Sequence, residues 1–182
     1  LVESSKIGNN EFKVVLEPLE RGFGHTLGNA LRRTLLSSMV GSAVTEVAID
    51  GVMHEFSTID GVQEDVLDIL LNLKEVSVAL NTAETAEVVI DKKGPYTITV
   101  ADIETSATDV TAFNSDKVIA TVNEGGHMRM TLKIGTGIGY DTAVSRSDEA
   151  STIGGIQLDA SYSPIKRVSF TVDAARVDQK VN

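Results

Sequence analysis

The sequence predicts an α+β fold that is rich in β-strands. Two stretches, residues 26–40 and 62–74, have the apolar spacing of amphipathic helices, and a series of shorter stretches has the alternating or β-branched composition of strands. Glycine-containing turns separate these strands, and no repeat of solenoid period is present. Helices and strands that do not alternate regularly favour an α+β body over a doubly wound parallel sheet.

The first predicted helix is apolar along one stripe and carries a second, mixed face. Large apolar residues recur at a four-residue spacing on the stripe: Leu27, Leu31, Leu35 and Met39. On the opposite side Leu36 lies with Arg33 and Asn29, which predicts a second docking surface. Gly28 lies within the helix, where glycine costs about 0.5–1 kcal/mol relative to alanine, so we expect another segment to pack closely against it. We expect Thr26 to be the N-cap.

The second helix is predicted over Val62–Lys74. Its apolar residues fall on one face, its first turn is acidic, and Lys74 at its end suits the helix dipole. Such acidic residues can form a catalytic pair, but a solvated helix face is the more common reason for them. The helix is therefore expected to cover a sheet.

Strands are predicted at residues 12–16, 43–49, 52–57, 76–80, 86–90, 96–100, 117–122, 127–134 and 165–172. The pair Asp50-Gly51 predicts a hairpin between the second and third of these. The alternation in 127–134 predicts that Met128, Met130, Leu132 and Ile134 are buried together. The glycines of 135–139 are expected to form a turn at the end of that strand, because they lack the lysine and hydroxyl pair of a phosphate-binding loop.

Composition excludes several classes of site. The 182 residues include no cysteine, which excludes disulfides and thiolate metal sites, and the net charge of −10 disfavours binding to a phosphate backbone. No stretch approaches the roughly 20 apolar residues of a membrane-spanning helix, and we expect a cytoplasmic protein. His25, His54 and His127 are far apart and lack the spacing of metal ligands, so we expect no catalytic, cofactor-binding or metal-binding residues.

Several long runs of sequence carry a resemblance to a known family. The run LEPLERGFGHTLGNALRR at 16–33, followed by LLSS at 35–38, is similar to the amino-terminal domain of the bacterial RNA polymerase α subunit. The resemblance continues through further runs, at 43–47, 49–52, 54–58, 61–65, 70–74, 162–164 and 174–177. It is weak only between about 81 and 123.

This resemblance implies a discontinuous fold and a role in transcription. Residues 1–40 and 165–182 would form a dimerisation and assembly subdomain, and 41–164 an inserted β-rich subdomain. The expected partners are a second α chain, identical or paralogous, and the polymerase β and β′ subunits, with no membrane and no direct contact to DNA by this part of the chain. No cofactor is expected in this chain, and magnesium is expected only in the partner subunits. The family's carboxy-terminal DNA-binding domain is not in the sequence, so we expect a portion of a longer protein.

The resemblance also assigns roles to individual residues. It implies contacts to β or β′ by six residues, with the first two favouring β: Arg33, Leu36, Lys74, Leu158, Arg167 and Arg176. Leu27, Leu31 and Leu35 would form the dimer-facing or core-facing stripe.

Four positions depart from the family pattern, and one of them is Val40, which stands where a proline is common. Gly155 and Ile138 each stand where an arginine is usual, which weakens the expected contact surface of the insert. Thr34 replaces an aliphatic residue and suggests a hypothesis in which the paired α chain is not identical.

Two alternative functions stay open. The chain could be a free-standing α+β interaction domain, or a small enzyme with a cleft in its β-rich part, since a Ser-His-Asp site assembles in space and not along the sequence.

Overall fold

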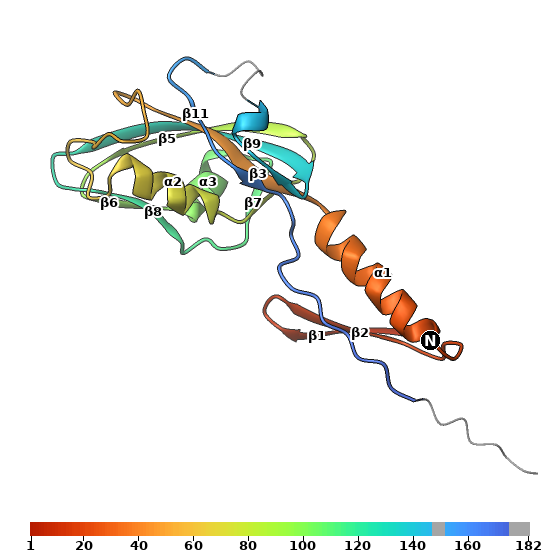
Figure 1. Cartoon of the computed structure of the whole chain (residues 1–182). Helices are drawn as coiled ribbons and strands as arrows, with labels where there is room; N and C mark the ends of the chain where they lie inside the picture. Colours follow the sequence, from red (N-terminus) through yellow and green to blue (C-terminus); the bar gives the residue numbers. More distant parts are fainter. Residues whose placement is uncertain (147–151, 175–182) are drawn as a thin grey trace, which may run out of the picture. The chain divides into compact units, whose positions relative to one another are not determined.

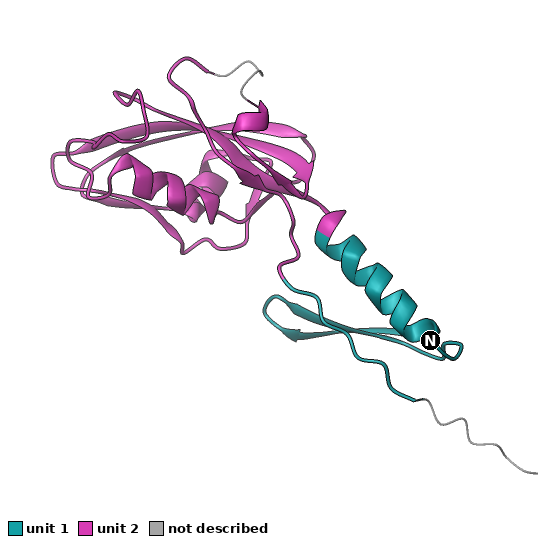
Figure 2. Ribbon diagram, viewed as in Figure 1, with its two compact units in different colours: residues 1–36, 167–182 teal, residues 37–166 magenta. Residues whose placement is uncertain are grey.

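The structure is a computed structural model that describes residues 1–146 and 152–174. It confirms the predicted α+β class, with helices packed beside antiparallel sheets. The chain forms two compact units, residues 1–36 with 167–182 and residues 37–166 (Figure 2). The sequence analysis predicted the boundaries between the two subdomains after residue 40 and before residue 165. The compact units are divided after residue 36 and before residue 167.

The elements follow one another along the chain as shown in Figure 1. The helices are α1 (Phe23–Ser37), α2 (Val66–Lys74), α3 (Val100–Ser106) and a short 3-10 helix (Val144–Arg146). The strands are β1 (Val2–Gly8), β2 (Glu11–Leu16), β3 (Val40–Ile49), β4 (Val78–Leu80), β5 (Thr85–Lys93), β6 (Tyr96–Thr99), β7 (Val110–Ala112), β8 (Val118–Val122), β9 (His127–Ile138), β10 (Tyr140–Asp141), β11 (Ile156–Gln157) and β12 (Ala160–Ser161).

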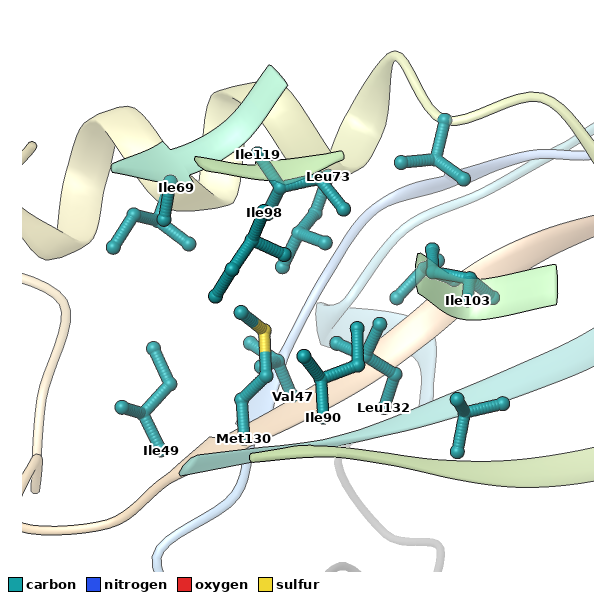
Figure 3. Packing of buried hydrophobic residues seen from close by; sticks show 14 of the residues in the cluster. Val47, Ile49, Ile69, Leu73, Ile90, Ile98, Ile103, Ile119, Met130 and Leu132 are labelled. Carbon is teal, nitrogen blue, oxygen red and sulfur yellow. The ribbon is translucent and has the colours of Figure 1, made fainter. Parts of the chain in front are cut away.

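The second unit is built on a four-stranded antiparallel sheet in the order β11-β3-β9-β5. One face of this sheet forms the core, and helix α2 supplies Ile69 and Leu73, whose side chains point toward Val47 and Leu132 of the sheet (Figure 3). The short pairs β4-β7, β6-β8 and β10-β12 complete the unit. The four residues predicted to be buried along β9 are buried, as its alternation requires.

Helix α2 begins four residues later than predicted, because the residues before it bond to β8. Val62 forms a bridge with Val122, and the carboxylate of Glu64 accepts hydrogen bonds from the Thr121 N–H at 2.6 Å and from the Thr121 hydroxyl at 2.9 Å. Asp65 is the N-cap and accepts from the Asp68 N–H at 2.8 Å. These contacts keep residues 62–65 out of the helix.

The predicted hairpin at Asp50-Gly51 is wrong. The turn itself is present, with Gly51 at φ 80° and the Val52 N–H donating to the Ile49 carbonyl at 3.1 Å. Residues 52–57 form no strand, because β3 pairs with β9 on one side and with β11 on the other. Both edges of β3 near this turn are thus occupied by strands from the second half of the chain.

The glycine run of 135–139 belongs mainly to a strand and only its last residue forms the predicted turn. Strand β9 continues to Ile138, and Gly139 turns the chain with φ 72°. An ideal Cβ on Gly137 would lie 2.7 Å from Cε2 of Tyr162, so the glycine makes room for this ring. Helix α3, which the sequence analysis missed, follows β6 directly, and Asp102 accepts from the Thr99 N–H at 2.9 Å.

The first unit contains the β1-β2 hairpin, α1 and the segment 167–174. The helix begins at Phe23, so Thr26 lies within it and is not the N-cap. The strand predicted at 165–172 does not form. Instead the segment follows one side of α1, and the Nε of Arg32 donates to the Val168 carbonyl at 3.2 Å. The Phe170 ring lies against Gly28, which confirms that this glycine is a position of close approach.

Candidate partner-binding surfaces

Helix α1 carries five of the residues predicted to bind partners, and none of its residues is buried. The stripe formed by Leu27, Leu31 and Leu35 is partly open, with Leu31 41% exposed. Arg33 is exposed and Leu36 is half-buried. Both faces of the helix therefore retain surface that a partner can cover.

Apolar exposure extends across the rest of the first unit. Val2, Phe12 and Val14 of the hairpin and Phe23 of α1 are also exposed, Phe12 at 66%. Among the described residues, every buried hydrophobic side chain lies between residues 43 and 162. The described part of the first unit thus has apolar surface without buried core residues of its own.

The polar substitution at Thr34 is satisfied within the helix. Its hydroxyl donates to the Ala30 carbonyl at 3.0 Å, four residues earlier. This local hydrogen bond means that Thr34 does not require a polar group from a partner.

The structure brings Lys74 and Leu158 together, although they are far apart in the sequence. Both line a shallow depression of about 170 Å³ in the second unit, beside α2 and the segment after β11. Leu158 is only 2% exposed and belongs to the core, so its side chain offers almost no surface. Leu67 and Leu71, which line the same depression, are 43% and 51% exposed and supply the accessible apolar surface.

A polar network lies at the rim of this depression. The Nζ of Lys74 is 3.6 Å from an oxygen of Asp159. The Ala143 N–H donates to Asp159 at 2.8 Å, and this bond together with the Tyr140 hydroxyl lowers the pKa of Asp159 below its ordinary value. The hydrogen bond between Tyr140 and Asp159 also raises the pKa of Tyr140. Asp159 is the residue that the sequence analysis missed; its position next to Leu158 was the only available signal.

The two remaining predicted contacts, Arg167 and Arg176, come near the end of the sequence. Arg167 is exposed in the first unit. Arg176 lies outside the described residues.

A larger hollow of about 530 Å³ lies over β9 and includes Arg146, Asp141 and Tyr162. Arg146 is buried, and its NH1 donates to the Thr45 carbonyl at 3.2 Å while its Nε lies 3.0 Å from Asp141. The Nε lacks hydrogen-bond geometry but is ion-paired. This arginine therefore holds chain segments together.

The histidines are separated and make local contacts. The Nδ1 of His54 accepts from the Phe56 N–H at 3.3 Å, and His127 pairs with Asp91. No group of three or more histidine, aspartate or glutamate side chains suited to a metal ion occurs in the described ranges. Within the same residues, no helix is both long and apolar enough to span a membrane.

The fold and the comparison with known families agree on identity. Residues 47–163 match the family model described as the RNA polymerase Rpb3/RpoA insert domain, which is more than half of the chain. The matched residues fall within the second compact unit, which contains the four-stranded sheet and the Lys74 depression. The chain therefore belongs to the RNA polymerase Rpb3/RpoA family, as the amino-terminal domain of a DNA-directed RNA polymerase α subunit.

Proposed function

We propose that this chain dimerises through its first unit and that the dimer is the assembly platform for the β and β′ subunits. The observation that carries the proposal is the apolar surface of α1 and the β1-β2 hairpin, in a unit whose described residues include no buried hydrophobic side chain. Such a surface is stabilised by burial against another chain.

In this proposal, a second copy of the chain covers the apolar surface of α1 and the β1-β2 hairpin. Fully burying a leucine contributes about 1.5–3 kcal/mol, and an obligate dimer buries upwards of about 2,000 Å² in total. Leu27, Leu31 and Leu35, with the exposed apolar residues of the hairpin, provide apolar area of the required kind. An identical partner suffices, because the Thr34 hydroxyl is already bonded to Ala30.

The large subunits would bind to surfaces that the stripe leaves open. Arg33 and Leu36 on α1 would bind β, and Lys74 with its depression would bind one of the two large subunits. A preassembled dimer presents these surfaces together and reduces the entropy lost when the large subunits join. In this proposal the chain contributes no catalytic residue, and the magnesium chemistry belongs to the partners.

Sedimentation of the full α chain at micromolar concentration tests dimerisation. We expect the mass of a dimer for the unmodified chain and the mass of a monomer for Leu31→Asp, which places a charge on the stripe. The matched control is Ile153→Asp, at a residue of the second unit that is 98% exposed, which should leave the dimer intact. A monomeric unmodified chain would contradict the proposal.

Mass spectrometry of the complex isolated from cells tests the identity of the pair. Two copies of this chain are expected. A second, different α chain in the complex would instead support the paralogous partner suggested by Thr34.

A further inference from the structure

We propose that Asp159 is a positioning residue that holds the Lys74 ammonium group at the rim of the depression, ready for a large polymerase subunit. The inference rests on the proposed function and adds a residue to it. Its basis is the arrangement of Asp159, which is fixed from several sides, beside a lysine that is partly exposed.

The Asp159 carboxylate is held by groups other than Lys74. The Ala143 N–H donates to its Oδ1 at 2.8 Å, and the Tyr140 hydroxyl also bonds to it. Both donors lie in the segment that contains β10 and the 3-10 helix. The carboxylate therefore keeps its position independently of the lysine.

The backbone that carries Asp159 is fixed as well. The Leu158 N–H donates to the Thr45 carbonyl at 2.8 Å, and the buried guanidinium of Arg146 donates to the Leu158 carbonyl. The Leu158 side chain is buried in the core. These bonds fix the backbone around Leu158, and so they hold the Asp159 carboxylate beside the end of α2.

Lys74 has few constraints apart from this carboxylate. It is the last residue of α2, its side chain is 40% exposed, and its Nζ lies 3.6 Å from Oδ2 of Asp159. A lysine has many rotamers, and restricting them before binding reduces the entropy that binding removes. The second carboxylate lining the depression, Glu55, forms no ion pair with Lys74 in the described part of the chain.

The surroundings indicate the chemistry of the partner segment. Leu67 and Leu71 offer exposed apolar surface in the same depression as the ammonium group. A segment of a large subunit with an apolar side chain and a neighbouring carboxylate or carbonyl oxygen fits this arrangement. The apolar side chain would enter the depression, and the oxygen would accept a hydrogen bond from Lys74.

A double-mutant cycle on the full α chain tests the inference. Affinity for purified β and β′ subunits is measured for the unmodified chain, Lys74→Met, Asp159→Asn and the double variant. Asparagine preserves the size of the side chain and an acceptor for the Ala143 N–H. We expect Asp159→Asn to weaken binding roughly fivefold to tenfold, and to have no further effect once Lys74 is methionine. Glu87→Gln, at an exposed acidic residue of β5 that does not line the depression, is the matched control and should leave the affinity unchanged.

Nuclear magnetic resonance of the Lys74 side chain provides a second readout that needs no partner. We expect this side chain to become more mobile in Asp159→Asn and not in Glu55→Gln. Unchanged mobility, or an equal loss of affinity in both Lys74 backgrounds, would overturn the positioning role. Failure of the unmodified chain to bind either large subunit would overturn the proposed function, while the mobility measurement would still decide whether Asp159 holds Lys74.

Discussion

The ring of Phe170 occupies the space that a side chain at Gly28 would need. An ideal Cβ at Gly28 would lie 2.5 Å from Cδ2 and 2.9 Å from Cγ of the Phe170 ring. Four residues earlier, a Cβ at Gly24 would lie 2.8 Å from Cγ1 of Val172. The two glycines lie one helical turn apart. Because neither has a side chain, the segment 167–174 can pack directly against the backbone of α1.

The substitution Gly28→Ala should destabilise the first unit. Alanine stabilises a helix by about 0.5–1 kcal/mol relative to glycine. The added Cβ would clash with the Phe170 ring as far as its Cγ, and overpacking of this kind typically costs about 1–3 kcal/mol. We expect a net loss of stability, measured as a lower midpoint of chemical unfolding for α1. Asn29→Ala, on an exposed neighbouring position, is the control; a rise in stability for Gly28→Ala would show that the ring moves away freely.

The substitution Arg33→Ala should weaken binding of the β subunit. If the guanidinium is desolvated against an acceptor of that subunit, truncation costs about 2–5 kcal/mol, whereas a solvated arginine contributes within about 1 kcal/mol. We expect the larger loss in a titration of purified β into the α dimer. Arg21→Ala, an exposed arginine before α1, is the control, and equal small losses for both would remove Arg33 from the contact.

The substitution Glu64→Ala should destabilise the second unit. It leaves both the N–H and the hydroxyl of Thr121 without the carboxylate, and an unpaired buried polar group costs about 1–3 kcal/mol. Because this contact is only part-buried, we expect the lower half of that range, measured by urea unfolding. Gln63→Ala, at the preceding exposed position, should change stability much less. Equal effects would show that the Glu64 bonds do not stabilise the fold.

Asp109 should make stability depend on pH in the acid range. The Thr82 hydroxyl and the Ala83 N–H lower the pKa of Asp109 below its ordinary value of 3.8. A lowered pKa in the folded state means that the stabilisation is present above the unfolded value and is lost as pH falls through the folded value. We therefore expect Asp109→Asn to be less stable than the unmodified chain at pH 7, with the difference closing below pH 3.8.

Thermal unfolding at several pH values measures this dependence. Asp116→Asn is the control, because the Asp116 side chain makes no hydrogen bond in the described part of the chain. A difference between Asp109→Asn and the unmodified chain that persists unchanged into acid would contradict the assignment to the Asp109 charge.

Local patterns in the sequence were sufficient for several elements. The four-residue spacing of Leu27, Leu31 and Leu35 predicted α1, and the alternation of 127–134 predicted both β9 and its buried side. Gly28 predicted a close approach, but not that Phe170 makes it. These features follow from the period of a helix or a strand, which is set by neighbouring residues.

Contacts between distant residues decided the remainder. The start of α2 depends on the hydrogen bonds that Thr121 donates to the Glu64 carboxylate, and the failure of the 50–57 hairpin depends on β9 and β11 occupying both sides of β3. The placement of Asp159 beside Lys74 depends on the same long-range packing. Short-range periodicity carries no information on such partners, because hydrogen bonds and burial are shared among segments that meet only when the chain has folded. The sequence by itself determined the helix stripe and the family, and tertiary structure decided which polar groups meet at the Lys74 depression.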